Sequence, residues 1–149
     1  MIANNYIQAD LIAAMKEDAP IVTEIGDEQG RIKEQQWAGT GFTYPAVRLR
    51  LNRQVPEGKS GCDHNRLSFS VLVFTEGGSS KEADLIAGLV NDLFAGDENG
   101  DGKFFHGETQ AGKEWTSTLR STGLDSAIRT GEKLWQAFAN FSCIVRRAS

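Results

Sequence analysis

One segment contains both of the patterns on which the expected fold rests: Leu67-Ser-Phe-Ser-Val-Leu-Val-Phe-Thr-Glu-Gly-Gly-Ser79-Ser-Lys-Glu82-Ala-Asp-Leu-Ile-Ala-Gly-Leu-Val-Asn-Asp-Leu-Phe94. Its first part has an apolar residue at every second position from Leu67 to Val73, the repeat of a strand with one buried face. In its second part the apolar residues recur at helical spacing. Ser79 and Glu82 have the spacing of a capping box, and Gly96 is a typical helix end. We therefore predict a strand followed by an amphipathic helix.

The rest of the chain supplies further helix and strand patterns. Apolar residues from Ile7 to Met15 recur at helical spacing after Asn5 and Gln8, a variant of the capping box, and Pro20 closes this helix. Alternating residues predict strands at 47–51 and 135–145, and a further strand is predicted at 114–120. A surface loop is predicted at 55–65, and short edge strands or loops at 21–25 and 31–37.

These elements are combined into one expected fold. A chain of 149 residues can bury one core and is short for two ordinary domains, so we expect a single domain over residues 1–149. Strands joined as hairpins, with two helices that each have one apolar face, predict an α+β fold: an antiparallel β-sheet with the two helices packed on one face. The core is expected to contain Leu85, Leu89, Leu93, Phe69, Val71 and Phe141.

Several apolar residues fall on the outward positions of the predicted strands. They are Leu72, Phe74, Phe138 and Ile144. A monomer in water has no evident reason to display them, because contiguous apolar surface usually marks an interface. We therefore predict that some of them lie at contacts between subunits.

Composition and charge exclude several classes of protein. Hydrophobic residues make up 40% of the chain, the formal net charge is −4, and the basic residues are scattered along the sequence. The sequence thus lacks the basic stripe of a protein that binds nucleic acid tightly. Residues 1–20 carry charges without an apolar core, so neither a signal peptide nor a membrane span is expected. The distant Cys62 and Cys143 are expected to be free thiols rather than a disulfide.

The sharpest chemical motif is a run of oxygen ligands at residues 97–108. Asp97, Asn99 and Asp101 stand at alternate positions, and Glu108 stands at the twelfth position of an EF-hand-like loop. A hard cation such as calcium requires this ligand type. However, glycines interrupt the exit helix that an EF-hand needs, and a turn-rich hairpin or loop explains the same residues.

Three other motifs are weaker indications of a binding or catalytic site. Gly58-Lys59-Ser60 resembles the end of a phosphate-binding loop, but it leads into a strand rather than a helix. Cys62-Asp63-His64 contains nucleophile, acid and base types, yet adjacent residues seldom converge on one point. A zinc site would need residues that lack paired-ligand spacing: Cys62, His64, His106 and Cys143. No catalytic, cofactor or metal site is therefore assigned.

The tryptophans and one acidic segment are predicted to have structural roles. Trp37, Trp115 and Trp135 are expected to anchor the core or an interface. An acidic turn is expected to be solvated, because no partner for it is apparent in the sequence. Its residues are Glu24, Asp27 and Glu28.

Two blocks of sequence carry a family resemblance. The first is Glu34-Gln-Gln-Trp37-Ala-Gly39-Thr-Gly41-Phe-Thr-Tyr44-Pro45-Ala-Val-Arg48, and the second runs from Phe69 to Thr75 and on through Ser79-Ser80 to Ala87. With the opening helix and the Trp135 strand, the chain resembles tail-completion or tail-terminator proteins of long-tailed bacteriophages over most of its length. No single residue is diagnostic.

The resemblance implies a structural virion protein rather than an enzyme. Subunits of such families form a hexameric ring that terminates the tail tube and meets the head-tail connector or stopper protein. The chain would then be found in the virion, at the head-tail interface, after assembly in the host cytoplasm. DNA would pass through the channel without specific binding, and neither a cofactor nor a membrane is implied. A head-completion (neck) protein and a calcium-binding interaction module remain alternatives.

Overall fold

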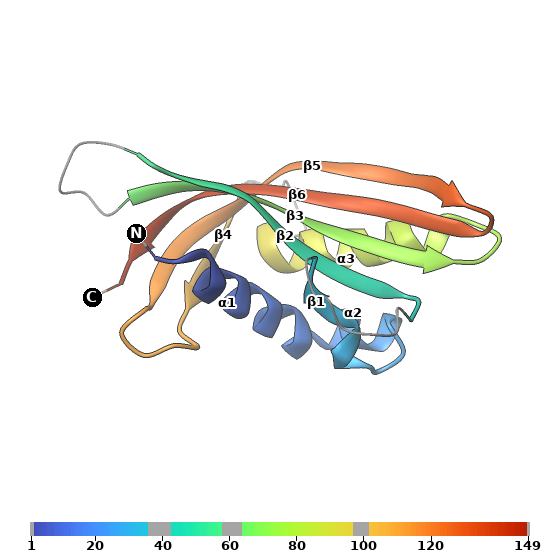
Figure 1. Cartoon of the computed structure of the whole chain (residues 1–149), viewed down its shortest axis with the longest axis horizontal. Coiled ribbons are helices and arrows are strands. Elements are labelled where there is room, and N and C mark those ends of the chain that lie inside the picture. The colour runs from blue at the N-terminus through green and yellow to red at the C-terminus, as the bar shows by residue number, and fades with distance from the viewer. Residues whose placement is uncertain (1, 36–42, 58–63, 97–101, 149) are drawn as a thin grey trace.

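The computed structural model describes residues 2–35, 43–57, 64–96 and 102–148 (Figure 1). Its helices are α1 (Asn4–Glu17), α2 (Ala19–Glu24) and α3 (Lys81–Ala95), with a 3₁₀ turn at Gln29–Arg31. Its strands are β1 (Ile32–Glu34), β2 (Ala46–Pro56), β3 (His64–Glu76), β4 (Lys103–Gly107), β5 (Trp115–Gly131) and β6 (Leu134–Arg147).

The strands form one mixed sheet of six, in the order β1-β2-β3-β6-β5-β4. Neighbouring strands are antiparallel except β1 and β2, which pair in parallel from Ile32↔Val47 to Glu34↔Leu49. The expectation of a purely antiparallel sheet was therefore wrong. A parallel pair cannot be joined by a tight hairpin, and residues 35–45 separate these two strands in the sequence.

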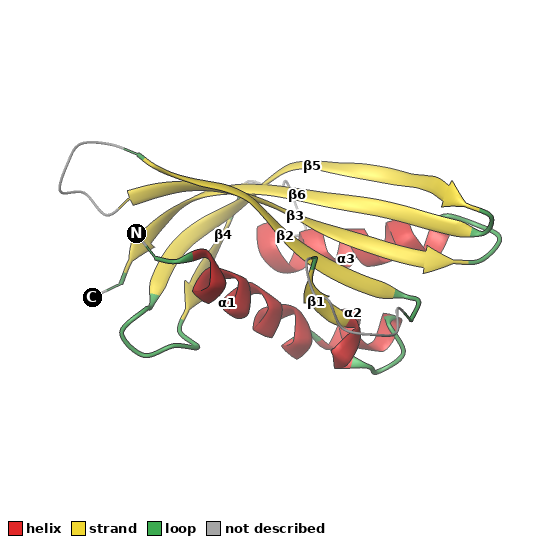
Figure 2. Cartoon of the chain, viewed as in Figure 1, coloured by secondary structure: helices red, strands yellow, loops and turns green. Residues whose placement is uncertain are grey.

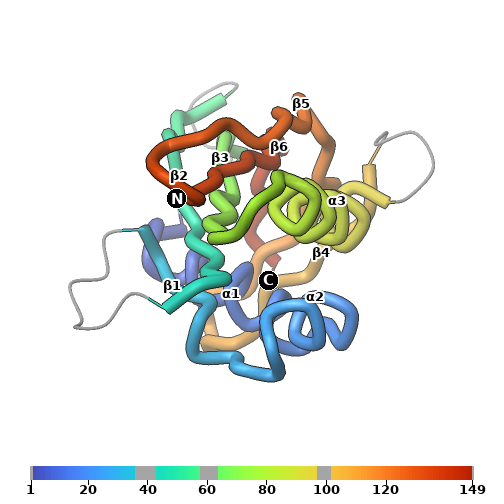
Figure 3. Tube along the Cα trace, turned by 90° about the vertical axis from the view of Figure 1, so that its right-hand side faces the viewer, coloured from blue at the N-terminus to red at the C-terminus, as the bar shows by residue number. Residues whose placement is uncertain are grey.

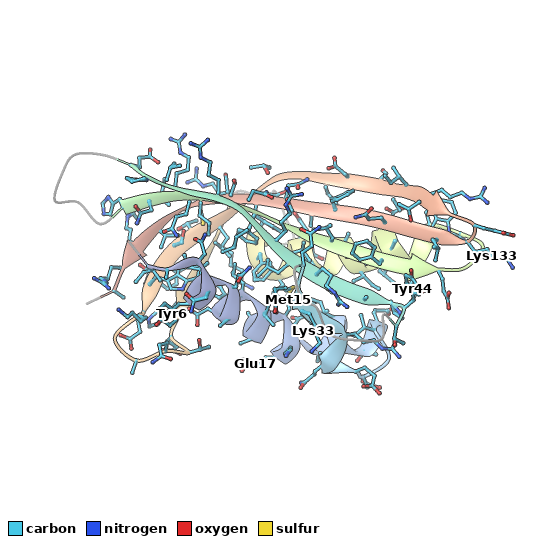
Figure 4. All side chains as sticks on the ribbon, in the orientation of Figure 1. Tyr6, Met15, Glu17, Lys33, Tyr44 and Lys133 are labelled. Carbon is cyan, nitrogen blue, oxygen red and sulfur yellow. The ribbon has the colours of Figure 1, made fainter. Side chains whose placement is uncertain are left out.

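The sheet curls into a half-barrel, and the helices lie along it (Figure 2). Helix α3 contacts β3, β5 and β6, α1 contacts β1 and β2, and both helices contact β4. The end-on view in Figure 3 shows the strands arching over α3. On α1, Met15 points into the space between the helix and the sheet and is fully buried, whereas Glu17 points away (Figure 4). Helix α1 thus buries one stripe, as its apolar spacing requires.

A third helix forms where a short edge strand or a loop was expected. Residues 21–25 have β-branched side chains, but they belong to α2 and its C-cap. The Asp18 side chain caps this helix by accepting a hydrogen bond of 3.2 Å from the Ile21 amide, and Pro20 lies in its first turn. These helix-starting residues outweigh strand propensity. The predicted cap of α1 was also wrong. Asn5 lies inside the helix, and the N-cap residue is Ala3, which makes no side-chain capping hydrogen bond.

Helix α3 is where the sequence predicted it, but it is rotated relative to the expected core face. Phe69, Val71 and Phe141 are buried as predicted, whereas Leu85 is 49% exposed. Leu89 and Leu93 are only partly buried. The buried residues of α3 are Ala83, Ile86, Ala87, Val90, Phe94 and Ala95. The apolar stripe of α3 is wider than the sheet surface that it covers, so its Leu85 edge is left in solvent.

An aromatic cluster joins α3 to the centre of the sheet. The rings of Phe69 and Phe141 stack at 5.0 Å, and Phe94 meets both edge-on at 5.8 and 5.5 Å. Such offset and edge-to-face pairs add specific geometry to the burial of apolar area. The predicted end of α3 is confirmed, because Gly96 adopts φ 87°, a left-handed value that favours glycine.

Strand β4 was not predicted, and a buried carboxylate holds it in place. Asp10 of α1 accepts hydrogen bonds from Trp115 Nε1 at 2.6 Å, from the Thr109 amide at 2.9 Å, and from the Thr109 hydroxyl. Gly107 packs directly on this group, and a Cβ at that position would overlap both the indole of Trp115 and the Asp10 carboxylate. The β4–β5 turn is therefore fixed to α1.

Candidate functional site

The outward apolar residues predicted at subunit contacts lie on the face of the sheet away from the helices. Leu72 is only 3% exposed, so the expectation that it is displayed was wrong. Arg48 and Phe138 flank it on the neighbouring strands, and such long side chains cover a residue between them. Phe74, Phe138 and Ile144 are half-buried, so they offer partial apolar surface.

Larger exposed apolar side chains lie at the free edge of β5. Strand β4 pairs only with Trp115–Leu119, which leaves the edge of β5 beyond Leu119 without a partner strand among the described residues. Leu124 and Ile128 of this part are 49% and 55% exposed, and Leu85 of the neighbouring α3 is 49% exposed. The Asp84 side chain joins α3 to this edge by accepting a hydrogen bond of 2.8 Å from the Ala127 amide. An open edge beside apolar side chains is suited to association with another chain.

The outer face of the sheet also has a basic hollow of about 340 Å³. Strand pairing builds it: Ser142 of β6 lies opposite Arg120 of β5, and the next outward residue of β6, Ile144, lies opposite Arg66 of β3. Arg146 follows two residues later on β6. We call this site the arginine hollow, and its lining includes Arg66, Arg120, Arg146, Thr118, Ser142 and Ile144.

The three guanidinium groups of the arginine hollow differ in their pairing. Arg66 donates to Glu57 through two hydrogen bonds of 3.0 and 2.9 Å, and these bonds, together with the charge of Glu57, raise the pKa of Arg66. Arg120 and Arg146 are exposed and have no acidic partner within the described parts of the chain. The hollow therefore presents two unneutralised cations with the Ser142 and Thr118 hydroxyls nearby. Planar donor groups of this kind bind carboxylates or phosphates.

The scattered basic residues of the sequence are thus gathered by the fold. Alternation within β3 and β6 already placed Arg66 and Arg146 on outward positions. The pairing of β5 with β6 was needed to bring Arg120 beside them, and alternation within one strand does not give the register between strands. Arg48, by contrast, is buried and donates to the carbonyl oxygens of Arg31 and Val47.

The candidate zinc residues that the structure describes, His64, His106 and Cys143, are not brought together. Cross-strand pairs place His64, Arg146, Thr116 and His106 in one row, so the two histidines lie three strand spacings apart, about 14 Å. Cys143 is a free, buried thiol, and burial raises its pKa to about 11. Within the described residues, no three His, Cys, Asp or Glu side chains are grouped to hold a metal.

Other motifs fall wholly or partly outside the described residues. These are Gly58-Lys59-Ser60, Cys62, Asp63, Trp37, and the Asp97, Asn99 and Asp101 positions of the EF-hand-like run. In the part of this run that is described, Lys103–Gly107 is a strand paired with β5, where an EF-hand would lead into its exit helix. Glu108 follows that strand, and its Oε2 lies 3.6 Å from Nδ1 of His106.

The remaining expectations concern tryptophans, acidic residues and membrane spans. Trp115 is fully buried in the core, as predicted, and Trp135 is partly buried with its Nε1 donating to the Gly77 carbonyl at 3.0 Å. Glu24, Asp27 and Glu28 are exposed, which confirms a solvated acidic turn. None of the helices in the described ranges is long and apolar enough to cross a membrane.

The comparisons with known proteins find matches among solved structures. No protein-family model matches the sequence. No curated protein sequence matches it either. Among solved structures, the chain is similar in fold to a chain of the virion of a native gene transfer agent particle, with a TM-score of 0.68 and 15% sequence identity over 93% of both chains.

Proposed function

We propose that this chain is a structural, non-enzymatic subunit of a bacteriophage-like virion. The supporting observation is the shared fold with a chain of a gene transfer agent virion, which extends over 93% of both chains. The exposed apolar residues beside the free β5 edge add to this support, because a subunit that works in an assembly needs such contact surfaces.

Within the virion, we propose that the chain forms a ring, most simply a hexamer, that terminates the tail tube and joins it to the head. Its partners would be further copies of itself, the tail tube protein and the head-tail connector or stopper protein. The DNA would pass through the channel without specific binding. A head-completion protein of the same neck region would use the same surfaces, and the two roles differ in which neighbour the ring contacts first.

Assembly of the purified protein tests the ring. Sedimentation velocity and negative-stain images should reveal rings, either of the protein alone or after addition of purified tail tubes. Ile128→Asp should weaken assembly, because it places a charge on an exposed apolar position of β5 while circular dichroism stays unchanged. Thr130→Asp is the matched control, since Thr130 is an exposed polar residue of the same strand.

Loss of the gene product tests the role in the virion. A null mutant should produce tails of uncontrolled length or tails without heads, the two direct consequences of an absent terminator. Heads that leak DNA beside tails of normal length would favour head completion instead. Normal particles with full infectivity would refute a structural role at this joint.

A further inference from the structure

The arginine hollow contains two positive charges that no acidic side chain of the described residues neutralises. Arg120 and Arg146 are exposed and have no acidic partner within the described residues, although Asp and Glu outnumber Lys and Arg by 20 to 16 in the chain. Exposed arginines often stay unpaired, but here they surround a hollow of about 340 Å³ together with Arg66. That shape and charge suit a small group of anions.

Carboxylates fit this hollow better than the phosphates of a duplex. Glu57 already binds Arg66 with both carboxylate oxygens, so a guanidinium at this hollow takes a bidentate carboxylate. Tight binding of nucleic acid relies on many cations along a track, because each neutralised phosphate adds separately to the affinity. Arg53, opposite Ser68 in the row that continues through Ser142 to Arg120, adds a further cation beside the hollow, but in a chain of net charge −4 these arginines make a compact cluster rather than a long track.

The same chain carries an exposed acidic patch. Glu24, Asp27 and Glu28 are exposed at the end of α2 and in the turn after it. No ion pair to these three carboxylates occurs within the described residues. Asp27 adopts φ 61°, a left-handed value found in tight turns, so the carboxylates are carried on a sharply bent piece of backbone. We call these residues the acidic turn.

The two patches lie on opposite sides of the subunit. The arginine hollow is on the outer face of the sheet, near the start of β3 and the end of β6, toward the left in Figure 1. The acidic turn is on the helix side, at α2, toward the lower right. A ring of identical subunits joined head to tail requires two different, complementary patches on separate surfaces of each chain.

We infer that the arginine hollow binds the acidic turn of a neighbouring copy of this chain. This inference rests on the proposed ring and names the contact that closes it. Arg120 and Arg146 pair with the carboxylates of the neighbour, and the Ser142 and Thr118 hydroxyls donate further hydrogen bonds. Because the contact is electrostatic and partly exposed, it weakens as salt is raised.

Charge reversal on each side tests this contact. The hollow variant carries Arg120→Glu and Arg146→Glu, and the turn variant carries Glu24→Arg and Glu28→Arg; Asp27 is left in place because of its positive φ. Each variant alone should lower the affinity of self-association at least about tenfold, because like charges then face each other. Sedimentation velocity at low and high salt measures this effect.

An equimolar mixture of the two variants gives the sharpest outcome. If copies alternate around the ring, every contact again joins opposite charges, so the mixture should assemble within about threefold of the wild-type affinity. A hollow variant mixed with wild type should not recover, because half of its contacts remain repulsive. The control variant Lys81→Glu/Lys103→Glu makes the same change in net charge as the hollow variant, at exposed positions outside both patches, and should assemble normally.

The outcomes separate this contact from the proposed function. Unchanged assembly of both reversed variants, or no recovery in the mixture, overturns the inference while the ring stands. Rings that form through this contact yet never bind tail tubes support the inference and count against the terminator role. Wild-type protein that stays monomeric even with tail tubes overturns both. Retention of a 20-base-pair duplex by wild type, lost in the hollow variant while rings persist, would assign the hollow to phosphate instead.

Discussion

Replacing Asp10 by alanine probes the tie between α1 and the β4–β5 turn. Asp10 is 4% exposed and accepts hydrogen bonds from Trp115 Nε1 at 2.6 Å and from both the amide and the hydroxyl of Thr109. Alanine removes all three acceptor contacts at once. The indole N–H, fully buried, is then left without a partner, whereas the exposed Thr109 can turn to water.

The expected loss follows from these different environments. An unsatisfied buried donor costs about 1–3 kcal/mol, and a hydrogen bond to a charged group contributes about 1.5–3 kcal/mol net of its exchange with water. The desolvation of the buried carboxylate, which the variant avoids, offsets part of this sum. We expect a net loss of about 2–4 kcal/mol in the free energy of unfolding. For a chain of this size that lowers the melting temperature by roughly 5–12 °C.

Urea denaturation followed by tryptophan fluorescence and circular dichroism measures this loss. Asp10→Asn should lose about half as much, because one amide oxygen still accepts from Trp115 while the amide nitrogen opposes the Thr109 donors. Asn5→Ala is the control, since Asn5 is an exposed residue of the same helix. If Asp10→Ala unfolds within about 0.5 kcal/mol of that control, the carboxylate does not hold the turn and the reasoning fails.

Three further changes follow from the packing and the thiol. Gly107→Ala should lose at least about 2 kcal/mol in urea denaturation, because its Cβ would overlap the Trp115 indole, and wild-type stability would show that the turn simply shifts. Ile86→Ala should cost about 2–5 kcal/mol and Leu85→Ala about 0.5 kcal/mol or less, and equal losses would mean that α3 is rotated differently. Burial raises the pKa of Cys143 from 9.0 to about 11, so its contribution is fully present below pH 9 and is lost as pH rises toward 11, by roughly 2–3 kcal/mol. Denaturation of wild type and Cys143→Ala at pH 8 and pH 10.5 isolates this effect, and parallel losses in both would contradict it.

Local sequence patterns predicted those elements whose burial has one clear period. Alternation placed β2, β3 and β6, and the run that ends at Gly96 placed α3, because a two-residue or helical repeat of apolar residues follows directly from facing a core. Patterns failed where short signals competed. The β-branched residues after Pro20 became α2, and Lys103–Gly107, between turn-forming residues, became β4 through its pairing with β5.

Long-range pairing decided the properties on which the proposed contacts depend. The sequence determined that the chain is mildly acidic, and it predicted that Glu24, Asp27 and Glu28 form a solvated turn. It did not contain the register that brings Arg120 beside the other arginines, nor the rotation of α3 that exposes Leu85. The register of a strand and the rotation of a helix depend on the element that each one packs against. The sequence pattern of one element does not identify that neighbour. The arginine hollow therefore exists only in the folded chain.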